Sequence, residues 1–308
     1  MSPLRQALAD YLMVRRSLGY KLDRAGKLLI QFVAYLEGIG AEAVTTERTL
    51  AWAVLPASGR VSWWAHRLSA ARGFAVYLHA LNPANEVPPT DLLPHRPCRA
   101  TPYLYTEDDI AALLTAAGSL RSPLRVATHQ TLIGLLAVTG LRVGEAIRLD
   151  RSDLDFDRGG LTVRVSKFGK SREVPLHPTT LDALRRYLCH CDRLHPHPAT
   201  PAVFISTAGT RLLYCNVNWT FLQLVRRAGL KPRSPSCRPR LHDLRHTFAI
   251  RTLLDCYRDG GDVQARLPLL STYLGHVDPA ATYWYLSAAP ELLGLAAGRL
   301  ERHLGGRS

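Results

Sequence analysis

Apolar residues in the first part of the chain recur every three or four positions, which is the spacing of one face of an α-helix. One such face is formed by Leu29, Phe32, Val33 and Leu36. A longer amphipathic pattern covers residues 61–81, VSWWAHRLSAARGFAVYLHAL. We therefore expect residues 1–81 to form an N-terminal helical domain.

The helical periodicity stops between residues 82 and 103, in NPANEVPPTDLLPHRPCRATPY. Proline is frequent in this stretch, and proline lacks a backbone N–H donor and disfavours helix. We therefore predict a linker over residues 82–103, followed by a second domain over residues 104–308.

Regular patterns return in the second domain. Thr106 followed by the acidic EDD predicts a helix start, and an apolar helix from about Leu124 should end at Gly140. Alternating residues over 161–165 and 172–176 predict two strands that pair across the turn SKFGKS. Helical patterns fill the rest, so the predicted fold class is mainly α with a small antiparallel β-sheet (α+β).

The charge balance of the chain favours a polyanionic partner. The 308 residues include 39 Lys and Arg against 25 Asp and Glu, a formal net charge of +14, and 47% of them are hydrophobic. A chain of this size can bury a large core. A cationic surface binds phosphate chains by releasing their counterions, so the simplest partner is nucleic acid.

Several other classes of protein fit the sequence poorly. Six cysteines are too few for a disulfide scaffold, and the start MSPLRQALADYL lacks the pattern of a secretory signal. The most apolar run, LIGLLAVTGL from Leu132, is too short to span a bilayer. We therefore expect a cytoplasmic protein with no membrane partner.

Two motifs carry basic residues suited to phosphate chemistry. In TGLRVGEAIRLD, residues 139–150, Arg142 opens a helix and Glu145 follows one turn later. Lys167 lies at the tip of the predicted hairpin, close to Lys170. Taken alone, these residues are better explained as a surface ion pair and as solvated lysines.

Two further motifs supply histidine, arginine and tyrosine. LHDLRHTFAI places His242 and Arg245 on one helical face, with His246 beside them. In YLGHVDP, His276 precedes an Asp-Pro pair that can start a helix, and Tyr285 lies on that helix.

Three tyrosines in LSTYLGHVDPAATYWYL, residues 270–286, compete for a chemical role. Tyr273 lies among leucines, which favours packing. Tyr283 and Tyr285 point about 200° apart on one helix, so only one of them can face a substrate.

In this order and spacing the motifs resemble the tyrosine recombinase (phage integrase) family, whose catalytic set is Arg, Lys, His-x-x-Arg, His or Trp, and then Tyr. The resemblance covers residues 105–285 and includes transposon-associated members. It implies that the catalytic residues are Arg142, Lys167, His242, Arg245, His276 and the nucleophile Tyr285. Glu145 matches the acidic partner of the first arginine. Lys170 is a rival to Lys167, because hairpin tips shift by a few residues.

The chemistry of these residue types agrees with the resemblance. Two guanidiniums can hold both non-bridging oxygens of a phosphodiester. A phenol with a reference pKa of about 10 needs a base to attack, and a lysine can protonate the leaving hydroxyl. His242 and His276 can transfer protons or hold the phosphate. The resemblance implies a 3′-phosphotyrosyl intermediate and a free 5′-hydroxyl, with no metal, ATP or other cofactor.

The resemblance also implies an architecture and partners. An N-terminal helical core-binding domain and a C-terminal catalytic domain would wrap double-stranded DNA in the nucleoid, with Arg67, Arg72 and Lys170 as candidate DNA-binding residues. Four protomers would hold two sites in a tetrameric synapse, with room for companion recombinases. The tail helix after Tyr285 would either dock on a neighbouring protomer or fold back onto its own domain.

Alternative interpretations keep the same scaffold or the same residue types. A type IB topoisomerase would relax DNA by the same chemistry without partner sites, and a non-catalytic regulator would bind DNA without cutting it.

A zinc site could be built from Cys189, His190, Cys191, His195 and His197. The C-x-C spacing is unusual for zinc, so we favour a helix end that runs into a loop.

Overall fold

The structure, a computed structural model, describes residues 2–55, 59–93, 100–164, 171–276, 278, 280–288 and 290–305. It consists of two compact units, Met1–Arg99 and Ala100–Ser308. The division between them falls inside the stretch that the sequence predicts as a linker.

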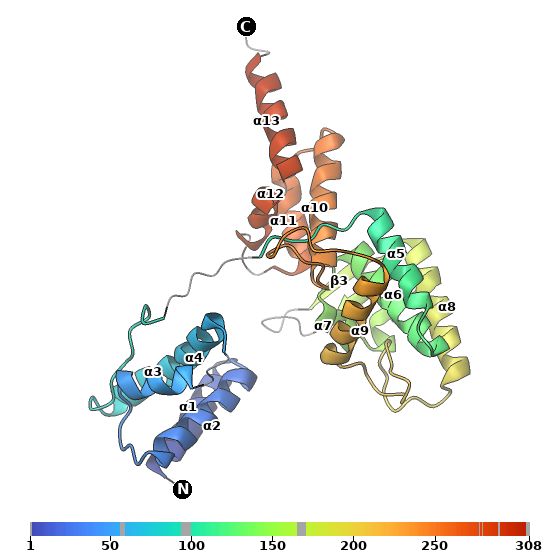
Figure 1. Cartoon of the computed structure of the whole chain (residues 1–308). Helices are drawn as coiled ribbons and strands as arrows, with labels where there is room; N and C mark the ends of the chain where they lie inside the picture. The colour runs from blue at the N-terminus through green and yellow to red at the C-terminus, as the bar shows by residue number, and fades with distance from the viewer. Residues whose placement is uncertain are drawn as a thin grey trace. The chain divides into compact units, whose positions relative to one another are not determined.

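The first unit is helical, as the apolar periodicity predicts (Figure 1). Its described part contains α1 (Pro3–Ser17), α2 (Asp23–Gly38), α3 (Thr46–Val54) and α4 (Val61–Leu81). The core is centred on the buried rings of Phe32, Trp52 and Phe74. Phe32 belongs to the apolar face predicted on α2, and α4 has the bounds predicted from its amphipathic pattern.

The first half of the predicted linker is attached to this helical unit. The backbone N–H of Val44 donates to Asn85 Oδ1 at 3.0 Å, and Arg72 Nε donates to the carbonyl oxygen of Pro88 at 2.8 Å. Leu92 and Leu93 pack against the core. Proline density predicts the absence of a helix, but it does not predict whether an extended segment packs against its neighbours.

The second unit carries the sheet and most of the helices. Its described elements are, in order, α5 (Glu107–Gly118), α6 (Pro123–Thr139), α7 (Val143–Arg148), the short 3-10 helix η1 (Arg151–Asp153), β1 (Leu154–Asp155), β2 (Gly160–Val163), β3 (Arg172–Pro175), α8 (Pro178–Leu194), α9 (Tyr214–Arg227), α10 (Asp243–Arg258), α11 (Val263–Leu274), α12 (Ala280–Ala288) and α13 (Pro290–Gly305).

The sheet is antiparallel and is ordered β1-β2-β3. The register of β2 and β3 pairs Leu161 with Val174 and Val163 with Arg172. The fold class predicted from the sequence, mainly α with a small antiparallel β-sheet, is therefore confirmed. The two-residue strand β1 was not predicted, because it is too short to show an alternating pattern.

Local sequence signals fix the helix ends that lead to the site. Thr106 and Asp109 form the capping box of α5. Gly140 ends α6 with a φ of 60°, a left-handed conformation that favours glycine. A Cβ atom on Gly140 would lie 2.5 Å from Cδ1 of Phe248 on α10. The end of α6 is therefore pressed against α10, which brings the next residues close to that helix.

The C-terminal helices share a second apolar cluster of this unit. Leu253 of α10, Leu270 of α11, Tyr285 of α12 and Leu292 of α13 are all buried in it. The tail helix α13 therefore begins against α10 of its own chain, and Arg258 contacts Glu291 at 2.8 Å. Among the described residues, no helix combines the length and the apolar character needed to cross a membrane.

Candidate active site

The predicted site residues come from four separate segments of the second unit. The α6–α7 junction supplies Arg142, the start of α10 supplies His242 and Arg245, and the segment from the end of α11 through α12 supplies His276 and Tyr285. The fourth segment, the predicted hairpin tip with its lysines at 167 and 170, lies outside the described residues. Contacts between these segments bring the described members of the predicted set into one region.

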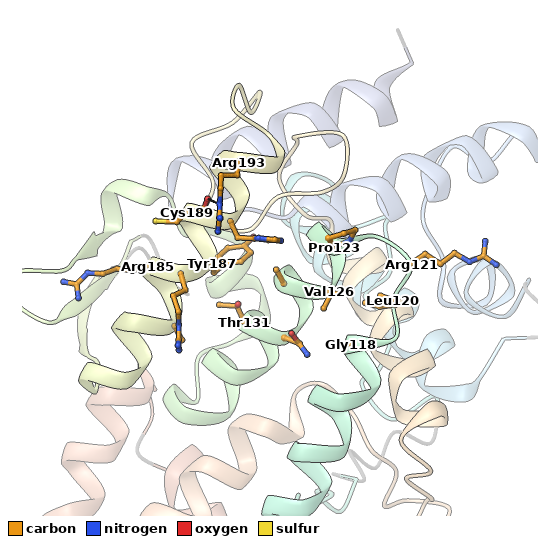
Figure 2. Close-up of a pocket in the computed structure, with 15 residues that line it drawn as sticks. Gly118, Leu120, Arg121, Pro123, Val126, Thr131, Arg185, Tyr187, Cys189 and Arg193 are labelled. Atoms are coloured by element: carbon orange, nitrogen blue, oxygen red, sulfur yellow. Dashed lines mark hydrogen bonds between the residues drawn. The ribbon is translucent and has the colours of Figure 1, made fainter.

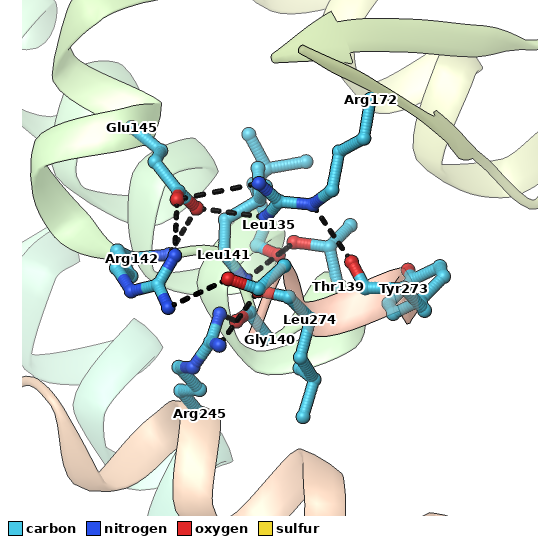
Figure 3. A network of polar contacts seen from close by, with 11 residues as sticks. Leu135, Thr139, Gly140, Leu141, Arg142, Glu145, Arg172, Arg245, Tyr273 and Leu274 are labelled. Atoms are coloured by element: carbon cyan, nitrogen blue, oxygen red, sulfur yellow. Dashed lines mark hydrogen bonds and ion pairs between the residues drawn. The ribbon is translucent and has the colours of Figure 1, made fainter. Parts of the chain in front are cut away.

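Arg142 is held by Glu145 and by the segment that carries His276. Its NH1 donates to Glu145 Oε1 at 2.6 Å, and its backbone N–H donates to Glu145 Oε2 at 3.0 Å. Its NH2 donates to the carbonyl oxygen of Gly275 at 3.1 Å (Figure 3). The guanidinium therefore has a fixed position while part of the side chain stays open to solvent.

A second arginine, which the sequence reasoning missed, shares the same carboxylate. Arg172 NH2 donates to Glu145 Oε2 at 2.8 Å, and Arg172 Nε donates to the carbonyl oxygen of Tyr273 at 2.7 Å. Burial alone would raise the pKa of Glu145, but hydrogen bonds and positive charge from Arg172 and Arg142 outweigh it and lower this pKa to about 2. Glu145 is therefore a charged link between the two arginines.

A signal for Arg172 is present in the strand pattern. Arg172 and Val174 lie two positions apart in β3 and therefore share one face of the strand. Val174 is buried, and so is Leu176 just after the strand. A charged side chain on a buried strand face needs an ionic or hydrogen-bonding partner, so the pattern indicates that Arg172 is paired inside the domain.

Arg245 is almost completely buried, with 2% of its surface exposed. Its NH1 donates to the carbonyl oxygen of Gly140 at 2.8 Å, and its NH2 donates to that of Leu274 at 2.7 Å (Figure 3). These carbonyls lie at the C-terminal ends of α6 and α11, where helix dipoles favour a cation. Burial, followed by the charge of Arg142, lowers the pKa of Arg245 to about 10. The side chain therefore stays charged at neutral pH.

Both predicted histidines are neutral in this environment at neutral pH. Burial, then the charges of Arg245 and Arg142, lowers the pKa of His276 to about 4. The same causes lower the pKa of His242 to about 4, although this residue as a whole is exposed to solvent. His276 Nδ1 is 2.7 Å from Thr282 Oγ1, and this contact fixes the orientation of the ring.

The structure separates the three tyrosines of the opening motif. Tyr285 is 2% exposed, whereas Tyr283 on the same helix is 54% exposed. The ring of Tyr285 lies 6.0 Å from that of His276. Tyr273 stacks on Phe248 with ring centroids 5.5 Å apart, so its ring packs as expected. Of the three, Tyr285 is the phenol that faces the histidines and arginines.

Among the candidate DNA-binding residues, the structure argues against Arg67. This side chain is 6% exposed, its NH2 donates to the carbonyl oxygen of Trp52 at 2.7 Å, and its guanidinium lies 3.9 Å from the centre of the Trp52 ring. Arg67 therefore covers the aromatic core instead of reaching toward DNA. Arg72 is partly exposed, and its Nε donates to the carbonyl oxygen of Pro88.

Two other features of the second unit, a surface hollow and the C-x-C motif, lie outside this cluster. An open hollow of about 970 Å³ lies on α5, α6 and α8 (Figure 2). It is lined in part by Arg121, Arg185, Arg186, Tyr187 and Arg193, and it shares no residue with the cluster. Cys189 is exposed and Cys191 is buried, so the two thiols of the C-x-C motif point apart on α8.

Known proteins resemble this chain over most of its length. Residues 104–291 match the Phage integrase family. The putative integrase/recombinase y4rB of Sinorhizobium fredii is 47% identical over 311 residues, covering 98% of each chain. The tyrosine recombinase XerC of Alcanivorax borkumensis is 31% identical over 218 residues, covering 71% of this chain and 66% of its own.

A solved structure shares the fold. The Tn1549 transposon integrase in complex with transposon right-end DNA superposes with a TM-score of 0.68 at 17% identity, covering 97% of this chain and 98% of that one. The family match spans the segments that carry the described cluster, from the α6–α7 junction to α12. The chain therefore belongs to the phage integrase family, the tyrosine recombinases.

Proposed function

We propose that this protein is a site-specific recombinase that cleaves and rejoins duplex DNA through a covalent 3′-phosphotyrosyl linkage to Tyr285. The observation that carries the proposal is the environment of this phenol. It is buried, its hydroxyl oxygen lies 3.3 Å from His246 Nδ1, and its ring faces His276. The charges of Arg142 and Arg245 act on the same histidine.

In the proposed step, the oxygen of Tyr285 attacks the phosphorus and the 5′ oxygen of the next nucleotide leaves. Arg142 and Arg245 donate to the non-bridging oxygens, whose charge redistributes during the displacement. Neutral His242 and His276 can add hydrogen bonds without adding a permanent charge. Lys167, assigned from the family resemblance, protonates the leaving oxygen.

The covalent linkage keeps the energy of the phosphodiester bond. The 5′-hydroxyl of the same or another strand can therefore attack the phosphotyrosine and restore the DNA in the reverse of the first step. Because one phosphodiester is exchanged for another, the reaction requires no ATP as an energy source. The proposed step also requires no metal ion.

Duplex DNA is the proposed partner. The net charge of +14 favours a polyanion, and the transposon integrase that shares the fold was solved with DNA. We extend the proposal to a tetramer that joins two sites, as the family resemblance implies. An integrase or transposon role, with companion recombinases, belongs to the same proposal.

A trapping experiment tests the proposed chemistry. A binding site is first selected from a random-sequence pool of duplex DNA, and a nick is then placed next to the scissile position so that the cleaved end diffuses away. The wild type should accumulate a protein–DNA adduct that resists denaturation. Tyr285→Phe should form none while still binding DNA, because it loses only the attacking oxygen.

Tyr283→Phe is the matched control, since it changes an exposed tyrosine two residues away on the same helix. It should form the adduct at the wild-type rate. An adduct from Tyr285→Phe, or none from the wild type, would overturn the proposal. Relaxation of supercoiled plasmid without any preferred sequence would instead favour the topoisomerase alternative.

A further inference from the structure

His246 occupies a position that the predicted catalytic set does not use. It is the residue after Arg245 on α10, and its Nδ1 lies 3.3 Å from the hydroxyl oxygen of Tyr285. The ring packs edge-on against the rings of His242 and Trp284, with distances between ring centroids of 4.7 Å and 5.2 Å. Its side chain is 15% exposed. These contacts hold one ring nitrogen at the phenol oxygen.

The other ring nitrogen faces a buried carboxylate. His246 Nε2 lies 4.0 Å from Asp243 Oδ1, and Asp243 is fully buried. Arg240 orients this carboxylate, with NH2 2.9 Å from Oδ1 and Nε 3.0 Å from Oδ2. The carboxylate lies beyond hydrogen-bond distance of Nε2, but its negative charge favours the tautomer that carries the ring proton on this nitrogen. Nδ1 is then left with a lone pair that can accept from the phenol.

The two histidines of the predicted set are less suited to remove this proton. Their pKa values are lowered by burial and by the nearby arginines, that of His276 to about 4, and a weak base removes a phenolic proton poorly. The ring of His276 also lies within 22° of parallel to that of Tyr285. Its Nδ1 is engaged by Thr282 Oγ1, 2.7 Å away.

Building on the proposed function, we propose that His246 is the general base for Tyr285, with Asp243 as its positioning residue. The phenolic O–H bond breaks, its proton moves to Nδ1 of His246, and the oxygen forms the bond to phosphorus as the 5′ oxygen leaves. The resulting imidazolium faces the Asp243 carboxylate. In rejoining, His246 returns the proton to the departing phenol oxygen.

Two variants separate proton transfer from mere contact. His246→Asn places an amide near the position of Nδ1, so it can still hydrogen-bond the phenol but cannot take a proton. On the nicked substrate selected as above, adduct formation in a single turnover should slow by about 10²-fold or more. DNA affinity and the melting temperature should stay near wild type. His190→Asn on α8 is the matched control and should cleave at the wild-type rate.

His246→Ala tests the same step by chemical rescue. Imidazole added to the solution should speed adduct formation by this variant and leave the wild type and Tyr285→Phe unchanged. Cleavage by His246→Asn within threefold of wild type would overturn the proposal, and so would a slow His246→Ala that imidazole does not accelerate. A wild type that forms its adduct at another tyrosine, as mapped by peptide mass spectrometry, would instead overturn the proposed function itself.

Discussion

Arg172 and Glu145 form a forked ion pair, with NH2 2.8 Å from Oε2 and NH1 3.3 Å from Oε1. Glu145 is 3% exposed and also binds Arg142. A strand residue outside the predicted catalytic set therefore fixes the carboxylate that orients Arg142, the first arginine of that set.

Arg172→Met should lower both stability and cleavage. The substitution keeps the apolar stem but leaves Glu145 buried with one arginine fewer, a loss of about 3 kcal/mol for a buried pair. Cleavage should slow because Arg142 loses its fixed partner, while DNA binding should persist. Thermal melting and adduct formation measure the two effects.

Arg185→Met is the matched control for Arg172→Met. It breaks an exposed pair with Asp182, at 3.1 Å, which should contribute less than about 1 kcal/mol. Equal melting temperatures for the two variants would contradict the structural role of Arg172.

Arg142→Ala and Arg245→Ala should each lower both cleavage and stability. Each should reduce cleavage by about 10²-fold or more, since each removes a donor to the transition state. Arg142→Ala leaves buried Glu145 with one arginine fewer, and Arg245→Ala should cost about 1–3 kcal/mol because the carbonyls of Gly140 and Leu274 lose their buried partner. Denaturant midpoints and single-turnover cleavage measure the two effects, and normal cleavage by either variant would refute the phosphate assignment.

The hairpin lysines can be ranked with a modified substrate. Lys167→Ala should slow cleavage of ordinary DNA, because the 5′ oxygen then leaves without a proton. A 5′-bridging thiolate leaves readily without one, so it should restore cleavage by this variant. Restoration for Lys170→Ala instead would assign the proton donor to Lys170.

Acidification should destabilise the second unit through His276. Its pKa is 6.5 in the unfolded chain and about 4 in the folded chain. As the pH falls from 6.5 to 4, the imidazole binds a proton in the unfolded state but not in the folded state. The free energy of unfolding therefore decreases across this window from its value above pH 6.5.

His276→Gln isolates this contribution. Its denaturant midpoint should fall less steeply than that of the wild type between pH 6.5 and 4. Parallel curves for the two proteins would contradict the assignment. The carboxylate of Glu145, with its pKa of about 2, adds a separate loss between about pH 4.5 and 2.

Gly140→Ala should be more damaging than the same change at Gly229. Both glycines have positive φ angles, 60° and 70°, so alanine is strained at both. Only at Gly140 does the added Cβ meet a neighbour, the Phe248 ring at 2.5 Å; at Gly229 no atom lies within 4 Å. Gly140→Ala should therefore melt at a lower temperature and cleave more slowly. Similar effects at both positions would show that backbone strain alone decides the outcome.

The sequence was sufficient to predict most of the fold, because helix periodicity and caps are local signals. The α4 bounds, the Thr106 cap and the Gly140 stop all follow from neighbouring residues. Only the motif resemblance predicts that Arg142, Arg245 and Tyr285 lie close together. No local sequence pattern indicates which distant segments meet in space.

The features that were missed depend on tertiary contacts. Arg67 and Arg172 are charged residues on patterns that also contain polar surface positions, and their burial depends on Trp52 and Glu145, which are distant in sequence. The proximity of His246 to Tyr285 depends in the same way on the packing of α12 against α10.

The attachment of residues 82–93 to the first unit sets where that unit can be cut for separate study. A fragment that stops at Leu81, the last residue of α4, would leave the backbone N–H of Val44 without Asn85 and strip Leu92 and Leu93 from the core. A fragment that extends to Leu93 keeps these contacts. The usable boundary of an isolated N-terminal module therefore lies past the end of its last helix, within the proline-rich stretch.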